Sequence, residues 1–263
     1  MEIIVCVKRV PETAEAELII DEDKKRVKTD NLVFDINEWD EYALEEAVLL
    51  KEKYGGSVTA VTIGPEDADE TLRKCLAKGA DKAIRITDKK IEGSDGYAIA
   101  KILYNVIKDL NFDLILCGAQ ASDDGYAVVG VMLASLLGIP YATMVKKVEI
   151  LDGSVRVTRE LEEGLEEVVE VKLPAVLTIQ TGINKPRYAS IMSIRKARKK
   201  EIPVLDLKSL NLTEAEVGEK GSWVIIDELF TPERKKRCEI LSGDLDEVVS
   251  KVVKVMKERG LLK

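Results

Sequence analysis

The sequence predicts an α/β fold: a doubly wound, mostly parallel sheet with antiparallel additions and a C-terminal extension. Three observations lead to this prediction. Before about residue 140, short β-branched runs alternate with longer segments of helical period. After Pro140 the pattern becomes one of alternating strands, and beyond residue 205 it becomes charged and weakly periodic. With 263 residues, 46% of them hydrophobic, the chain can close a sizeable core.

The first part is expected to supply parallel strands and the helices between them. Asn37 is the expected N-cap of the first helix, and Gly55-Gly56 its end. A small hairpin is predicted over 18–29, turning at Asp23-Lys24. The predicted strands are 2–7, 57–63, 82–86 and 113–118, and the predicted helices are 38–54, 66–78, 96–110 and 125–137.

The part after Pro140 is expected to add strands to this sheet. Turns at Asp152-Gly153 and Glu163-Gly164 separate three strand-like segments, 145–151, 154–160 and 166–171. Pro174 then opens the run 175–179, which is apolar enough for a central strand. The α/β domain is therefore predicted to span residues 1–205.

Residues 206–263 are predicted to form a C-terminal arm. The segment 206–241 is charged, and an amphipathic helix follows at 244–259. Such a segment has little core of its own. It is either partly disordered or an arm that lies on another chain.

Composition excludes several classes of function. A net charge of −8 argues against a nucleic-acid binder, which needs a dominant basic surface. The absence of histidine excludes His-based catalytic triads and His-containing zinc sites. No metal-ligand spacing is visible, since the acidic runs 21–23 and 162–163 fall in predicted turns.

The expected compartment is the cytoplasm. Four cysteines lie far apart, which favours free thiols in a reducing environment. The first strand begins within three residues of Met1, which leaves no room for a signal segment, and no apolar stretch is long enough to span a membrane.

The segment from Gly118 to Tyr126 is the first candidate for a binding site. It leaves the carboxyl end of a buried strand and runs into a helix, the place where open α/β sheets bind ligands and where helix N–H groups can hold phosphate. Its small residues allow close approach of the backbone. The same segment also fits an ordinary turn in which Asp123 or Asp124 caps the helix.

Two further segments are expected at the same sheet edge. Lys8 and Arg9 follow the first strand, either as ligand contacts or as a solvated pair. Trp39 lies in the first turn of the helix that follows Asn37, where it can be a core residue or can face a flavin or adenine ring.

Residues 184–200 carry a fourth candidate. A turn leads into a short amphipathic helix that exposes Ile191 and Met192 at its tip and is rich in lysine and arginine. An apolar tip backed by positive charge suits transient docking to acidic proteins, although an ordinary surface helix fits as well.

Taken in order, these segments resemble the beta subunit of electron-transfer flavoproteins, to about Leu210. The most specific match joins Val157–Glu167 to Leu173–Val176, a charged turn followed by an apolar strand. Other matches are Val7–Val10, the helix start at 37–47 and the loop 118–130. The resemblance implies an adenine-nucleotide-binding, Rossmann-like domain in a heterodimer whose alpha subunit holds most of a redox-active FAD.

On this resemblance the chain carries electrons and catalyses no group transfer. Its partners are the alpha subunit, a dehydrogenase, and a quinone or ferredoxin oxidoreductase. Glu160 matches an acid that pairs with an arginine of the mobile alpha flavin domain, and Ile191, with Met192, matches the recognition tip for the dehydrogenase. The candidate cofactor-binding residues are Cys6, Val7, Lys8, Asn37, Trp39, Ile63, Gly118, Gln120, Ala121, Asp123, Asp124, Gly125, Tyr126, Ala127, Val128 and Val129.

The resemblance leaves two ligands open for this subunit, AMP and a second FAD. Subunits that bind AMP often read Asn-Gln-Thr where this chain reads Ala127-Val128-Val129. Electron-bifurcating members, which hold a second FAD that meets NADH, carry Ala and Val at the positions of Ala127 and Val129, but a Gly-Asp-Thr precedes them in place of Asp124-Gly125-Tyr126.

The rival interpretation is an ATP- or AMP-binding sensor, or an adenylating protein, of the same α/β superfamily. An adenylating enzyme is expected to show a Ser-Gly-Gly-x-Asp-Ser loop after the first strand, whereas Lys8-Arg9-Val10-Pro11 follows it here. The sensor interpretation does not explain the charged turn and apolar strand at 157–176.

Overall fold

A nine-stranded sheet forms the centre of the chain in the computed structural model, which describes residues 1–232, 238 and 240–262. Seven neighbouring strands are parallel, and the last two pair antiparallel at one edge. The predicted fold class is therefore confirmed. In spatial order the strands are β11 (Val204–Leu205), β5 (Lys82–Ile86), β4 (Ser57–Ile63), β1 (Glu2–Cys6), β6 (Leu114–Gly118), β10 (Ala175–Ile179), β7 (Tyr141–Ile150), β8 (Ser154–Glu160) and β9 (Glu166–Lys172).

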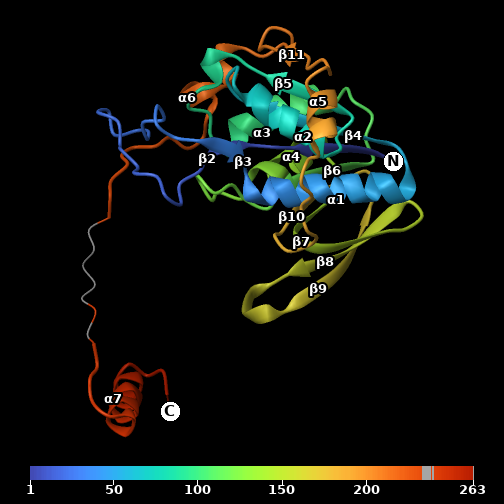
Figure 1. Cartoon of the computed structure of the whole chain (residues 1–263). Coiled ribbons are helices and arrows are strands. Elements are labelled where there is room, and N and C mark those ends of the chain that lie inside the picture. The colour runs from blue at the N-terminus through green and yellow to red at the C-terminus, as the bar shows by residue number, and fades with distance from the viewer. Residues whose placement is uncertain (233–237, 239, 263) are drawn as a thin grey trace. The chain divides into compact units, whose positions relative to one another are not determined.

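Helices cover both faces of this sheet, as a doubly wound fold requires (Figure 1). In β1, Ile3 packs into one hydrophobic cluster with Leu44 and Leu72, whereas its neighbour Ile4 packs into the other with Ile102 and Leu133. Successive side chains of a strand point to opposite faces, so one short strand serves two cores. The first cluster involves α1 (Glu38–Tyr54) and α2 (Ala68–Lys78), with α5 (Ile191–Ala197) packed on α2, and the second involves α3 (Gly96–Ile107) and α4 (Val129–Leu137).

Smaller elements complete the unit that spans Met1–Glu228. The predicted hairpin over 18–29 is reduced to a single bridge between Ile20 and Val27. A separate two-stranded sheet was not predicted, because its strands are very short. The small elements are β2 (Arg9–Pro11), β3 (Phe34–Ile36), η1 (Lys89–Ile91), η2 (Glu162–Gly164), η3 (Glu214–Glu216) and α6 (Gly218–Gly221).

The compact unit extends beyond the predicted boundary at residue 205. Four apolar side chains from the charged segment that follows are buried in the cluster beneath α3 and α4, which fixes this stretch to the first unit. These side chains are Leu207, Leu210, Leu212 and Val217.

The second unit, Leu229–Lys263, contains α7 (Leu245–Glu258). The Asp244 side chain accepts a hydrogen bond from the N–H of Glu247 at 2.9 Å and so caps the helix. None of the residues of α7 is buried, and Leu245 and Val249 on its apolar face are more than half exposed. Among the described residues, no helix combines the length and apolar character that a membrane crossing requires.

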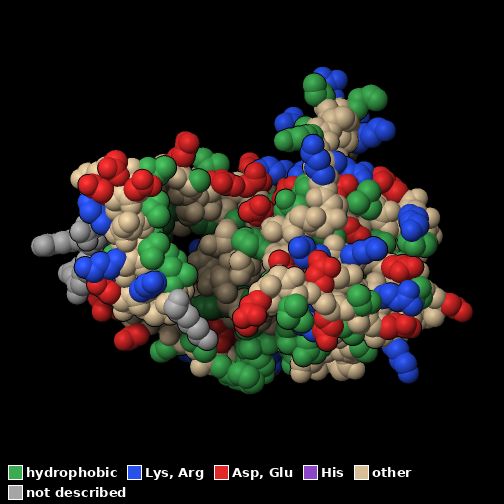
Figure 2. All heavy atoms as spheres, turned by 90° about the horizontal axis from the view of Figure 1, so that it is seen from below, with side chains coloured by type: hydrophobic (Ala, Val, Ile, Leu, Met, Phe, Trp, Pro, Cys, Tyr) green, Lys and Arg blue, Asp and Glu red, His purple; other side chains and the backbone are tan. Residues whose placement is uncertain are grey.

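Acidic and basic side chains are interspersed over the face shown in Figure 2. Neither sign forms a continuous field on that face. This mixture differs from the basic surface on which nucleic-acid binding depends.

Candidate functional site

A cavity of about 230 Å³ lies at the carboxyl edge of the sheet, where β1, β4 and β6 end. Its walls come from the exits of these strands, the start of α3 and the loop that leads into α4. Thirteen of the predicted cofactor residues line it: Cys6, Val7, Lys8, Asn37, Ile63, Gly118, Gln120, Ala121, Asp124, Tyr126, Ala127, Val128 and Val129. Trp39, Asp123 and Gly125 do not line it.

The buried carboxylate of Asp40 joins two of the strand exits. One oxygen accepts a hydrogen bond from the N–H of Lys8 at 2.7 Å, and the other accepts one from the N–H of Gly118 at 2.8 Å. Burial raises the pKa of Asp40 to about 7, although these hydrogen bonds favour the charged form. A Cβ at Gly118 would collide with this carboxylate, so a residue without a side chain is required there. Asp40 was not predicted as a site residue.

The side chain of Asn37 binds the loop that follows β6 and does not cap α1. Its amide nitrogen donates to the carbonyl of Gln120 at 2.8 Å, and its amide oxygen accepts from the N–H of Ser122 at 3.1 Å. It occupies the predicted N-cap position, but its side chain makes no capping bond. The predicted N-cap position is therefore confirmed, whereas the side chain binds a distant loop, as the residue types that cap helices can also do.

Lys8 lines the cavity and forms salt bridges with two aspartates of the loop that leads into α4. Its Nζ lies 2.7 Å from a carboxylate oxygen of Asp123 and 2.7 Å from one of Asp124. Burial disfavours the charged form of Lys8, yet the hydrogen bonds to these two aspartates outweigh it and raise the pKa of Lys8. The two aspartates do not cap α4, so the alternative of an ordinary capped turn was wrong. Arg9 is directed elsewhere, to Asp67 and over the ring of Phe34.

The helix α4 begins at Val129, later than the predicted start at residue 125. Gly125 and Ala127 both have a positive φ, which no helical periodicity in the sequence can reveal. The N–H groups of the first turn have no intrahelical acceptor, and Val129 and Gly130 of that turn line the cavity. A helix start of this kind can hold a phosphate through backbone dipoles.

Two close contacts fix the walls of the cavity. A Cβ on Gly96 would lie 2.5 Å from the side chain of Val128, and one on Gly130 would lie 2.6 Å from that of Thr178. The start of α3 therefore packs directly against the loop, and α4 packs directly on the sheet. The apolar part of the lining comes from Val61, Ile63, Ile99 and Leu103. An apolar wall beside backbone donors suits a ligand with an aromatic base and a phosphate.

The thiols of Cys6 and Cys117 form part of the floor, in register on adjacent strands. All four cysteines are free, and Cys6, Cys75 and Cys117 are buried. The hydrogen bond to Cys6, together with burial, raises the pKa of the Cys117 thiol. No group of three or more residues that could hold a metal ion occurs in the described part of the chain.

Trp39 and Glu160 lie outside the cavity but are linked to each other through Gln180. The indole N–H of Trp39 donates to Gln180 Oε1 at 2.8 Å, and the Gln180 amide donates to Glu160 Oε2 at 3.0 Å. Arg159, the neighbour of Glu160, turns instead to Thr143 and Glu167. Gln180 was not predicted as a site residue, although its position directly after the buried strand β10 was a usable signal.

Ile191 and Met192 are exposed at the start of α5, with 73% and 66% of their surfaces accessible. Ser190 caps this helix through a hydrogen bond from the N–H of Ser193 at 3.1 Å. The preceding Arg187 ties the segment to α1 through a salt bridge to the buried Glu45. The apolar tip is therefore held on an anchored segment, away from the cavity.

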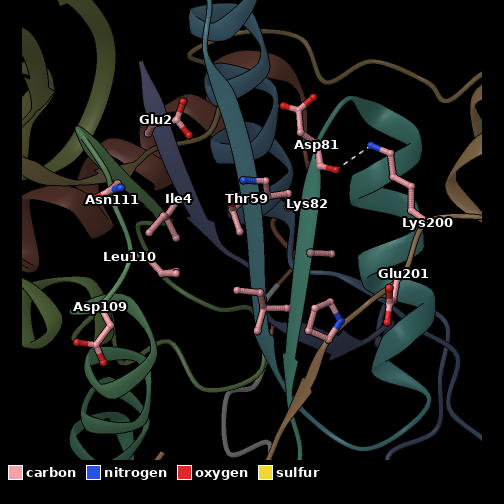
Figure 3. Close-up of a pocket in the computed structure, with 13 residues that line it drawn as sticks. Glu2, Ile4, Thr59, Asp81, Lys82, Asp109, Leu110, Asn111, Lys200 and Glu201 are labelled. Atoms are coloured by element: carbon pink, nitrogen blue, oxygen red, sulfur yellow. Dashed lines mark hydrogen bonds between the residues drawn. The ribbon is translucent and has the colours of Figure 1, made fainter.

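A larger cavity of about 650 Å³ lies at the opposite, amino edge of the sheet (Figure 3). It is lined by charged side chains of both signs, including Glu2, Lys82, Asp109 and Glu201. Lys200 lies against this edge and donates to the carbonyl of Asp81 at 2.9 Å. No predicted site residue lines this cavity, and ligands of open α/β sheets bind at the carboxyl edge.

Comparison with known proteins identifies the family of the chain. Residues 26–210 match the electron transfer flavoprotein domain. The chain is 40% identical to the electron transfer flavoprotein subunit beta of Methylophilus methylotrophus, over 98% of both chains. It is 38% identical to the subunit beta of Bacillus subtilis (strain 168), over 99% of both. It is also 34% identical over the full length of both chains to CarD, a subunit of the caffeyl-CoA reductase-Etf complex of Acetobacterium woodii.

Proposed function

The chain belongs to the beta subunits of the electron transfer flavoprotein family, and on this premise we propose that its cavity at the carboxyl edge holds an adenine nucleotide. The ligand is AMP or a second FAD. The observation that supports the proposal is the convergence of the Asn37 and Asp40 hydrogen bonds on one loop. These bonds hold the first part of the loop that leads into α4. The cavity has an apolar wall for the base and the start of α4 for the phosphate.

The phosphate is held by the backbone of the first turn of α4. Lys8 is already shared by Asp123 and Asp124, so this cation is not available for a direct salt bridge to the ligand. The polar side chains Asn-Gln-Thr of AMP-binding relatives are replaced by Ala127-Val128-Val129. Neutral N–H groups at the helix start remain as the donors.

The chain acts as an electron-carrier subunit without group-transfer chemistry of its own. Its alpha partner holds most of an FAD, which supplies the redox chemistry when bound. The half-buried ring of Trp39 faces that flavin, with Gln180 orienting its indole N–H. Glu160 is the contact for an arginine of the alpha flavin domain. Electrons come from a dehydrogenase, or from NADH in a bifurcating complex, and pass to a quinone or ferredoxin oxidoreductase.

The ligand of the cavity is tested by counting nucleotides in the purified heterodimer. Co-expression with the alpha subunit should give a yellow 1:1 complex, which is then denatured and assayed for released flavin and AMP. One FAD and one AMP per pair would identify AMP, and two FAD would identify the second flavin. One FAD with no further nucleotide would overturn the proposal.

Asn37→Ala should lower the affinity of the heterodimer for the nucleotide by about tenfold, because it releases the two hydrogen bonds that hold the loop. Isothermal titration of the stripped complex measures the change. Asn111→Ala is the matched control, since this exposed asparagine lines the cavity at the other sheet edge. Equal affinities for wild type and Asn37→Ala would contradict the role of the loop.

Ile191→Glu should slow electron transfer from the dehydrogenase by about tenfold or more, since it places a charge at the apolar tip that is proposed to dock the dehydrogenase. Flavin content should not change. Val204→Glu, at an exposed valine of β11, is the control and should leave the rate unaltered. An unchanged rate for Ile191→Glu would remove the docking role.

A further inference from the structure

The segment 218–226, here called the strap, is bound to the start of α3 by several hydrogen bonds. One carboxylate oxygen of Asp95 accepts from the N–H groups of Trp223 at 2.9 Å and Val224 at 3.0 Å. The N–H of Asp95 donates to the hydroxyl of Ser222 at 2.8 Å. Both the side chain and the backbone of one residue therefore fix the strap.

Neighbouring residues add to this attachment. The hydroxyl of Ser94 accepts from the N–H of Gly218 at 2.8 Å. The ring of Trp223 stacks on that of Tyr97 with centroids 3.8 Å apart and an interplanar angle of 14°. A Cβ on Gly218 would lie 2.6 Å from the carbonyl of Lys90, so the strap lies directly on the chain beneath it. Trp223 is still 72% exposed, which makes stacking its main contact.

The same residues form a wall of the 230 Å³ cavity. Ser94, Asp95 and Gly96 line it, and Gly96 packs against Val128 of the loop that leads into α4. The second carboxylate oxygen of Asp95 accepts from the N–H of Ala98 at 2.9 Å and caps α3. One carboxylate thus connects the helix cap at the cavity wall to the strap outside it.

We propose that Asp95 is a positioning residue of the cavity and that docking of the strap is coupled to nucleotide binding. When the strap is bound to the start of α3, residues 94–97 of the cavity wall and Val128 are held in the conformation that binds the nucleotide. Coupling between two binding events is reciprocal, so a bound nucleotide also holds the strap in place. This inference rests on the proposed function, because it requires a nucleotide in the cavity.

Two substitutions test this connection. Asp95→Asn leaves a single acceptor oxygen, so the side chain can no longer accept from the N–H of Ala98 and from the N–H groups of the strap at the same time. Trp223→Ala removes the stacking on Tyr97 and leaves the cap intact. The control is Val224→Ala, because it keeps the backbone N–H that Asp95 accepts.

The experiment uses the heterodimer freed of its cavity nucleotide, with AMP and then FAD as probes. Asp95→Asn and Trp223→Ala should each weaken binding by about five- to tenfold, with the melting temperature of the stripped complex close to wild type. Val224→Ala should bind as wild type does, and Trp223→Phe should recover most of the affinity. In wild type, the probe should slow amide hydrogen exchange over 218–226.

The outcomes distinguish the coupling from the proposed function. If the wild-type complex binds neither AMP nor FAD in the cavity, both fail. If the wild type binds a probe, but Asp95→Asn and Trp223→Ala bind it equally well and exchange over the strap is unchanged, the coupling alone is overturned.

Discussion

The helices α3 and α7 follow the same local rules but have different surroundings. Each starts with an aspartate whose side chain caps the first turn, Asp95 in α3 and Asp244 in α7, and each is amphipathic. The apolar face of α3 is buried in the core, whereas no residue of α7 is buried. An amphipathic pattern therefore predicts a helix and the face of it that becomes buried. It does not predict whether that face packs on the same chain or on another one. For α7 we propose the alpha subunit.

The largest expected effect compares one leucine from each region. Leu116→Ala in β6 removes a fully buried side chain and should lower the unfolding free energy of the isolated chain by about 2–5 kcal/mol. Leu245→Ala in α7, where the side chain is 78% exposed, should change it by less than about 0.5 kcal/mol. Urea denaturation measures both. A comparable loss in Leu245→Ala would show that α7 packs within its own chain.

An intermediate effect concerns Asp40, the buried acid at the cavity of the first unit. Asp40 holds a proton in the folded chain up to about pH 7, whereas the unfolded chain releases it near pH 4. Between these values the unfolded state binds fewer protons, so stability is lost as the pH rises, by about 1.4 kcal/mol per pH unit. Asp40→Asn should remove this slope. The variant therefore gains stability relative to wild type from about pH 4 to about pH 7, and the difference stays constant above that.

Denaturation of wild type and variant across this pH range measures the slope. Asp246→Asn, on the exposed helix α7, is the matched control. A difference between wild type and Asp40→Asn that is constant with pH would mean that Asp40 is ionised throughout the range. The two backbone hydrogen bonds it accepts would then outweigh its burial.

The smallest effect on folding is expected on the apolar face of α7. Val252→Asp should alter the unfolding free energy of the isolated chain by less than about 0.5 kcal/mol, because this side chain is 41% exposed. The same change should weaken association with the alpha subunit by about tenfold or more, since the complex would bury an unpaired charge. Ser250→Asp on the polar side is the control for titration calorimetry. Equal affinities for the two variants would leave α7 without a role in the heterodimer.

Much of the fold could be predicted because neighbouring residues determine it. The run Ala175–Ile179 after Pro174 is the buried strand β10, and α1 has the bounds its periodicity predicts. The boundary at residue 205 could not be predicted, since Leu207 and Leu210 are single apolar residues among charged ones. Their burial depends on a surface that exists only after the sheet and α3 have formed.

The location of the candidate site could be predicted, but the hydrogen bonds that join its parts could not. The loop after β6 follows from the rule that ligands bind at the carboxyl edge. Asp40, Asp95 and Gln180 act through hydrogen bonds to residues far along the chain. Sequence periodicity and motif spacing do not indicate which distant residues form hydrogen bonds with each other. Asn37 lies at a helix N-cap, yet its side chain binds a loop far along the chain.

The sharing of Lys8 between Asp123 and Asp124 has a consequence for selectivity. One cation beside two carboxylates leaves a net negative charge beside the cavity. Repulsion from that charge grows with each additional phosphate of a ligand, while the dipoles at one helix start are fixed in number. On the proposed function, we therefore expect the cavity to bind a nucleoside monophosphate more tightly than the corresponding triphosphate.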